Sequence, residues 1–193
     1  MGNVGMLNLT PASGASTHDP QHTIKVETIE TGRISITPCD EAGKGLLQAV
    51  LADRRVCDMY FAGVSRHSMQ VKMDAWGGQG DVDMFAVRER SSGNVIGCIE
   101  LIASHLSYFV APACWGQGYA SEMVVSFLAR LPALRELDAV YTTVVRENMA
   151  SRRILEKTGF DFAGIMPGRM AESAHTLLKY VCPVTARLAK VAV

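Results

Sequence analysis

One segment limits the possible folds of this chain more than any other. Over residues 118–130, apolar residues recur at intervals of three and four, the pattern of a helix with one buried face. The β-branched run 139–145 predicts a strand directly after it. A second helix is expected over 148–158, with Asn148 as its N-cap and Gly159 in the left-handed position that ends it. The second half of the chain therefore alternates strand and helix.

The rest of the chain is mostly strand-like. Alternating apolar patterns predict strands over 33–37, 84–90, 95–102, 106–110, 160–165 and 175–182, and helical spacing predicts helices over 41–51 and 67–75. Only two or three residues separate some of these strands, which favours antiparallel hairpins. We expect an α/β (α+β) fold with a mixed, mostly antiparallel central sheet of about six to seven strands, flanked by about four helices.

Composition limits the organisation and the function class. The chain has 193 residues, the size of one domain. Residues 1–22 are rich in Gly, Ser, Thr, Pro and Asn, so we expect a flexible extension there and a single domain over 23–193. A formal net charge of zero argues against a general nucleic-acid or anionic-membrane binder.

The cysteines, the histidines and the hydropathy of the chain indicate whether to expect a metal site, a disulfide framework or a membrane span. The five cysteines are odd in number and lack C-x-x-C spacing, and no H-E-x-x-H motif occurs, so we expect no metal site and a cytoplasmic location. No apolar run reaches the roughly 18 residues that a membrane span needs, so we expect no membrane association.

The stretch YFVAPACWGQGYASE, residues 108–122, carries the strongest functional signal. A strand runs into Pro112, which ends strand pairing, and Gly116-Gln117-Gly118 then leads directly into the amphipathic helix. The first N–H groups of a helix lack internal partners and carry partial positive charge, so this junction predicts a diphosphate site. The alternative is that the glycines only allow the positive φ angles of a tight turn and have no role in binding an anion. Ser121 stands where a G-x-G-x-x-G dinucleotide fingerprint would need glycine.

A second motif, RENMASRRILEKTGF, follows at residues 146–160. Together the two segments resemble the GNAT superfamily of acyl-CoA-dependent N-acyltransferases, in particular its ribosomal-protein N-terminal acetyltransferase-like branch. That branch has W-G-x-G-Y-A-x-E followed by N-x-x-S and a G-F pair. The matching residues are Trp115, Gly116, Gly118, Tyr119, Ala120, Glu122, Asn148, Ser151, Gly159 and Phe160. The resemblance covers about residues 24–182.

The resemblance implies acetyl-CoA as the donor and a GNAT-like sheet with a splayed central strand. The pantetheine arm would pair with the backbone of strand 107–110, and the diphosphate would meet the N–H groups of the glycine loop. Asn148 would hold the pantetheine, and Ser151 would lie near the thioester sulfur. The implied cofactor-binding residues are Tyr108, Phe109, Val110, Trp115, Gly116, Gln117, Gly118, Tyr119, Ala120, Ser121, Asn148 and Ser151.

Two positions depart from the family pattern. Ala113 stands where the family usually has Arg or Gln three residues before the first glycine, which removes one side chain from the loop. Leu155 stands where many members carry a tyrosine that serves as general acid, which makes Ser151 the next candidate for that role.

Two carboxylates are candidate bases or substrate-orienting groups. Alternation along strand 95–102 places Glu100 on one face with Ile96, Cys98 and Ile102, and a carboxylate removed from water becomes a better base. The alternatives are an outward face or a pair with an arginine. Glu172 follows the sixth strand, where the resembled branch often has an acidic residue near the substrate.

These features together predict an N-acetyltransferase. The acceptor would be a primary amine, either a protein or peptide N-terminus or a small molecule, attacking the thioester directly in a ternary complex. The alternative is a non-catalytic acyl-CoA-binding sensor or interaction module, which the missing tyrosine favours. An exposed final strand would allow pairing across a homodimer.

Overall fold

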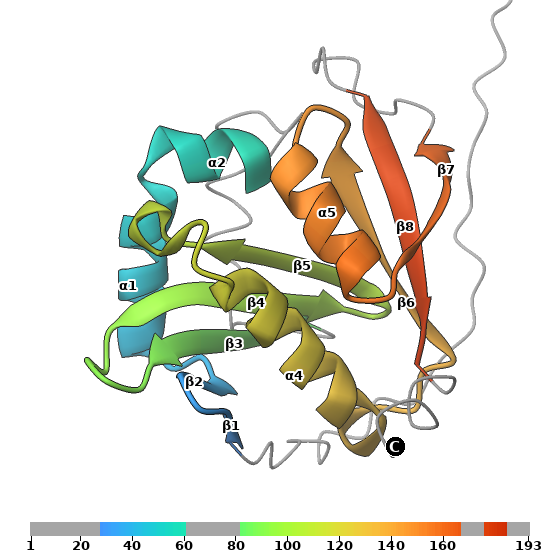
Figure 1. Ribbon diagram of the computed structural model, residues 1–193. Helices are drawn as coiled ribbons and strands as arrows, with labels where there is room; N and C mark the ends of the chain where they lie inside the picture. The colour runs from blue at the N-terminus through green and yellow to red at the C-terminus, as the bar shows by residue number, and fades with distance from the viewer. Residues whose placement is uncertain (1–27, 61–81, 167–175, 185–193) are drawn as a thin grey trace, which may run out of the picture.

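The computed structural model describes residues 28–60, 82–166 and 176–184 (Figure 1). The predicted extension 1–22, the predicted helix 67–75 and Glu172 lie outside the described residues. No helix in the described ranges is long and apolar enough to cross a membrane.

The described residues form a sheet of eight strands in the order β1-β2-β3-β4-β5-β6-β8-β7. All neighbours pair antiparallel except β5 and β6, which are parallel. The predicted mixed, mostly antiparallel sheet is confirmed, with one strand more than expected because a two-residue strand adds to the edge. The strands are β1 (Ile29–Glu30), β2 (Ile34–Pro38), β3 (Val82–Glu89), β4 (Val95–Ile102), β5 (His105–Val110), β6 (Ala139–Val145), β7 (Asp161–Met166) and β8 (Leu177–Pro183).

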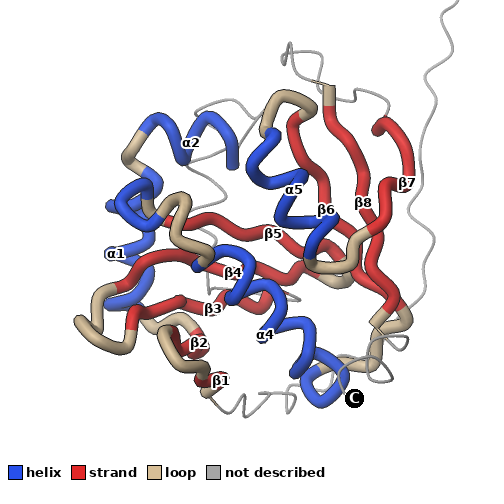
Figure 2. Tube along the Cα trace, in the orientation of Figure 1, coloured by secondary structure: helices blue, strands red, loops and turns tan. Residues whose placement is uncertain are grey.

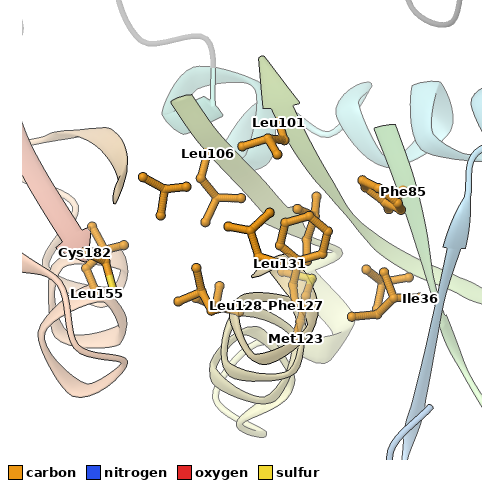
Figure 3. Packing of buried hydrophobic residues seen from close by; sticks show 14 of the residues in the cluster. Ile36, Phe85, Leu101, Leu106, Met123, Phe127, Leu128, Leu131, Leu155 and Cys182 are labelled. Atoms are coloured by element: carbon orange, nitrogen blue, oxygen red, sulfur yellow. The ribbon is translucent and has the colours of Figure 1, made fainter. Parts of the chain in front are cut away.

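Four described helices cover the two faces of the sheet: α1 (Glu41–Leu51), α2 (Arg54–Tyr60), α4 (Tyr119–Leu134) and α5 (Met149–Lys157). The α4 and α5 helices lie on one face, and α1 and α2 lie over the other (Figures 1 and 2). Figure 3 shows side chains of α4 gathered against the sheet residues Ile36, Phe85 and Leu106. Phe127 of α4 is fully buried and meets Phe85 edge-on at a ring distance of 5.0 Å. The predicted apolar stripe is therefore the core-facing side of α4.

Two helical segments differ from the sequence prediction. The α2 helix was not expected because its seven residues contain one buried side chain, Val56, and so show no apolar stripe. The Asp53 side chain starts this helix by accepting the Arg55 N–H at 2.9 Å. The α4 helix runs four residues past Arg130 and includes Pro132 near its end.

The parallel pair β5 and β6 opens almost as soon as it forms. The two strands pair only at His105 and Tyr141, where the Tyr141 N–H donates to the Ser104 carbonyl at 2.9 Å. Beyond this point they diverge, with β6, β8 and β7 at a steep angle to β3–β5 (Figure 1). The expected splayed strand is confirmed, but the opening begins at the first residue of β5. Pro112 lies two residues after Val110, the last residue of β5, and is not the cause of the opening.

Candidate active site

The N-terminus of α4 presents free amides, as the glycine loop predicted. Gly116 and Gly118 adopt positive φ angles of 73° and 83°, a backbone that other residues rarely adopt. The first intrahelical bond runs from the Glu122 N–H to the Gly118 carbonyl at 3.1 Å, so the N–H groups of the three residues from 119 to 121 precede it. Gly118, the N-cap residue, has no side chain to cap them. The glycines thus both shape a turn and leave unpaired helix-end amides of the kind that bind anions.

These amides border a cavity of about 680 Å³ whose walls include residues of β5, β6, α2 and α5. Most of the residues implied by the resemblance line it, together with Glu100. They are Tyr108, Phe109, Val110, Trp115, Gly116, Gly118, Tyr119, Ala120, Ser121, Asn148 and Ser151. Gln117 is not among the lining residues, because its side chain turns back to donate to the Ala113 carbonyl at 2.8 Å.

The backbone of β5 offers hydrogen-bonding groups to the cavity. The Ala111 N–H donates to the Ile96 carbonyl of β4 at 2.7 Å, on the side of β5 away from β6. Because backbone groups alternate sides along a strand, the N–H groups of Tyr108 and Val110 face the opening. The Trp115 indole donates to the Val110 carbonyl at 2.7 Å, so that carbonyl is already occupied. An extended ligand could form hydrogen bonds with the other backbone N–H and C=O groups of β5 that face the cavity.

Glu100 is buried beside a phenol. Its side chain is 7% exposed, and the Tyr60 hydroxyl donates to its Oε2 at 2.9 Å. Burial and the neighbouring carboxylate raise the pKa of Tyr60 well above its usual value, so Tyr60 stays a neutral donor. The outward-facing alternative for Glu100 is excluded. The sequence analysis missed Tyr60, which lies forty residues away on the unexpected helix α2.

A bulge corrects the predicted face of β4. Val87 pairs with Gly97 but Arg88 pairs with Val95, so Ile96 is an extra residue in β4. Ile96 therefore joins the core on the α4 face, while Cys98 joins the α1 face. The prediction that Ile96 shares a face with Glu100 is wrong, because period-two alternation fails across a bulge.

Asn148 and Ser151 meet Tyr108 at the start of α5. The Asn148 side-chain oxygen accepts the Ser151 N–H at 3.0 Å, which confirms Asn148 as the N-cap. The Ser151 and Tyr108 hydroxyls are hydrogen-bonded at 2.9 Å. Leu155, at the family's tyrosine position, is fully buried in the core. A hydroxyl pair thus lines the cavity in a protein that lacks the usual tyrosine.

The pH dependence of stability tests the environment of Tyr108. Burial raises the pKa of Tyr108 to about 12 from 10.0, although the bond to Ser151 opposes the shift. The stabilisation is complete below pH 10.0 and is lost as the pH rises toward about 12. Between about pH 10 and 11, the wild type should lose about 1 kcal/mol more unfolding free energy than Tyr108→Phe. Urea unfolding measures this, and equal losses in both proteins would contradict the assigned environment.

Two further side chains that line the cavity are those of His105 and Cys114. His105 Nε2 lies 3.3 Å from the Thr143 hydroxyl, and its ring packs on Tyr141 at 4.9 Å. Burial, and secondarily Glu89, raise the pKa of the Cys114 thiol. A raised thiol pKa disfavours a nucleophilic thiolate, which argues against an acyl-cysteine intermediate at Cys114.

Residues 33–161 match the family described as the acetyltransferase (GNAT) domain. The chain belongs to the GNAT family. A search of curated protein sequences finds no significant match. As a GNAT acetyltransferase, this protein shares the family fold with a solved spermidine N-acetyltransferase from Vibrio cholerae in complex with CoA and spermine. The TM-score is 0.68 at 16% identity, over 82% of this chain and 99% of the other.

Two ribosomal-protein acetyltransferases have the same fold. The first, from Salmonella typhimurium, modifies the N-terminal serine of the 50S subunit protein L7/L12; it has a TM-score of 0.65 at 13% identity, over 81% of this GNAT chain and 99% of its own. The second is the ribosomal-protein-S5-alanine acetyltransferase from Vibrio fischeri, with a TM-score of 0.65 at 12% identity, over 82% and 97% of the two chains. At these identities the likeness shows the fold.

Proposed function

We propose that this GNAT acetyltransferase transfers the acetyl group of acetyl-CoA to a primary amine, which is a protein or peptide N-terminus or a small molecule. The observation that carries the proposal is one cavity lined both by residues with free helix-N-terminal amides and by a buried carboxylate, Glu100. The first feature suits a diphosphate and the second suits an ammonium group. Acetyl-CoA and an amine supply these groups.

The donor side uses backbone groups. The amides at the start of α4 would bind the diphosphate, and this requires neither a basic side chain nor the arginine or glutamine missing at Ala113. The pantetheine would lie along β5, hydrogen-bonded to the Tyr108 carbonyl and the Val110 N–H. The Asn148 amide nitrogen is not used by its capping bond, which engages Oδ1, so it can donate to the pantetheine.

The acceptor side combines a carboxylate with aromatic rings. Tyr60, which holds Glu100, meets Phe109 edge-on at a ring distance of 4.9 Å. In the reaction, the amine lone pair forms the C–N bond, the C–S bond breaks, and the amine proton passes to Glu100 directly or through water. The thiolate takes a proton from the Ser151 hydroxyl, which regains one from solvent through the hydrogen-bonded Tyr108 hydroxyl, and Glu100 releases the amine proton to solvent before the next turnover. The Tyr108 N–H, which also faces the cavity, would stabilise the oxyanion.

The chemistry of deprotonation favours an α-amino acceptor. Only a neutral amine attacks, and at pH 7 deprotonation costs about 1.4 kcal/mol for an α-amino group but about 4.6 kcal/mol for a lysine. Glu100 is the only carboxylate among the described residues that line the cavity, which suits one ammonium group. A protein N-terminus or a small amine with one ammonium group fits both the low cost of deprotonation and the one carboxylate in the described part of the cavity lining.

Thiol release with a panel of amines tests the reaction. The panel should contain peptides with free N-termini, polyamines and lysine peptides, each with acetyl-CoA, and free thiol should appear fastest with the N-terminal peptides. Coenzyme A binding without thiol release for any amine would instead support the non-catalytic acyl-CoA sensor.

A matched pair of glycine variants tests the diphosphate site. Gly116 and Gly93 have φ angles of 73° and 72°, and an added Cβ would meet nothing within 4 Å at either position. Alanine at either position should therefore cost a similar unfolding free energy, about 1 kcal/mol. Only Gly116 lines the cavity, so only Gly116→Ala should weaken coenzyme A binding, by about tenfold. Calorimetry measures both affinities, and unchanged binding in Gly116→Ala would argue against this site.

A further inference from the structure

An arginine far from the glycine loop in sequence holds that loop in place. Arg33, just before β2, donates through Nε to Glu122 Oε2 at 2.7 Å and through Nη1 to the Gln117 carbonyl at 2.9 Å. Its guanidinium also lies 4.6 Å from the centre of the Tyr119 ring. One side chain thus contacts the loop and the first turn of α4.

The partners of Arg33 are fixed in turn. The Thr31 hydroxyl donates to Glu122 Oε1 at 2.5 Å, and the Tyr119 hydroxyl donates to Glu89 at 2.5 Å. Burial opposes ionisation of Glu122, but the bonds from Thr31 and Arg33 lower its pKa overall, so it remains charged. The first turn of α4 is therefore tied to the β1–β2 turn and to β3.

The bond to the Gln117 carbonyl also sets the direction of an amide. In a trans peptide the C=O and N–H groups point in opposite directions, so fixing the Gln117 carbonyl fixes the N–H of Gly118. Gly118 lines the cavity, whereas Gln117 does not. A loop with two glycines has much backbone freedom to lose, and amides bind an anion tightly only when they are already oriented.

We propose that Arg33 is a positioning residue for the binding of the diphosphate of acetyl-CoA, acting through Gln117 and Glu122 and not by contact with the ligand. Arg33 restrains the glycine loop, which the short side chain of Ala113 cannot do. This inference rests on the proposed function. The fork of the guanidinium is needed because it bonds the carboxylate and the carbonyl at once.

The test compares coenzyme A with pantetheine, which lacks the diphosphate. Arg33→Met should weaken coenzyme A binding by about tenfold in calorimetry and leave pantetheine binding, followed by NMR titration, unchanged. The control is Arg54→Met, which removes an exposed arginine paired with Asp58 at 4.0 Å and away from the cavity lining. An equal loss for both ligands, or no loss for either, would overturn the proposal.

Two further variants separate positioning from direct contact. If Arg33 bound the diphosphate itself, Glu122→Gln would free its charge and tighten coenzyme A binding; positioning predicts several-fold weaker binding. Arg33→Lys keeps the charge but not the fork, so it should remain as weak as Arg33→Met. Tighter binding in Glu122→Gln or full affinity in Arg33→Lys would overturn the proposal. Failure of the wild type to bind coenzyme A would instead refute the proposed function.

Discussion

Glu100→Gln is expected to lower kcat/KM for the acceptor amine by about 10²–10⁴-fold at neutral pH, the usual contribution of a general base. Glu100 is buried in the cavity wall and receives a hydrogen bond from Tyr60. Glutamine keeps the size and the acceptor oxygen but cannot take the amine proton. Coenzyme A affinity should be unchanged, because the expected diphosphate site uses amides of α4.

The pH dependence makes this prediction specific. As the pH rises toward the pKa of the amine, more acceptor is already neutral, so the defect of Glu100→Gln should shrink. Initial rates of thiol release at neutral and alkaline pH measure it. Glu136→Gln, an exposed carboxylate on the loop after α4, is the control and should match the wild type. A defect of equal size at every pH, or none, would remove Glu100 as the base and leave Glu172 as the remaining candidate.

Gly97→Ala is expected to destabilise the fold by about 1–3 kcal/mol and to weaken coenzyme A binding. A Cβ at Gly97 would lie 2.4 Å from the Phe109 carbonyl oxygen and 3.3 Å from the Val110 Cα. Both are backbone atoms of β5, so no side-chain rotation relieves the clash and the strand must shift. The same strand carries the amides that face the cavity, and its displacement should disturb pantetheine binding. Urea unfolding and calorimetry measure the two effects.

A glycine-to-alanine substitution in α1 should change the free energy of unfolding in the opposite direction. Gly45 is exposed within α1, and a Cβ there meets nothing within 4 Å. Alanine is a better helix former, so Gly45→Ala should raise the free energy of unfolding by about 0.5–1 kcal/mol without changing coenzyme A affinity. Equal stability changes in the two variants would show that the close approach of β4 and β5 is not what requires Gly97.

Local patterns predicted the parts of the site that depend on neighbouring residues. The stripe on α4, the glycines before it and the Asn148 cap follow from helical spacing, φ preference and capping chemistry, which act within a few residues. The sequence also showed that Ala113 and Leu155 depart from the family pattern, but it did not show the structural consequence of either departure. Leu155 proved to be a core residue, and Ala113 lies in a short 3-10 helix before the loop that Arg33 restrains.

The sequence by itself determined the glycine loop, the helix that follows it and the family to which the chain belongs. Only the tertiary structure decided which side chains meet there. Tyr60 reaches Glu100 across forty residues, and Arg33 reaches Glu122 across 89. Such contacts depend on strand order, on the bulge at Ile96 and on the opening between β5 and β6. Local periodicity does not encode these features, because they arise when distant segments pack together.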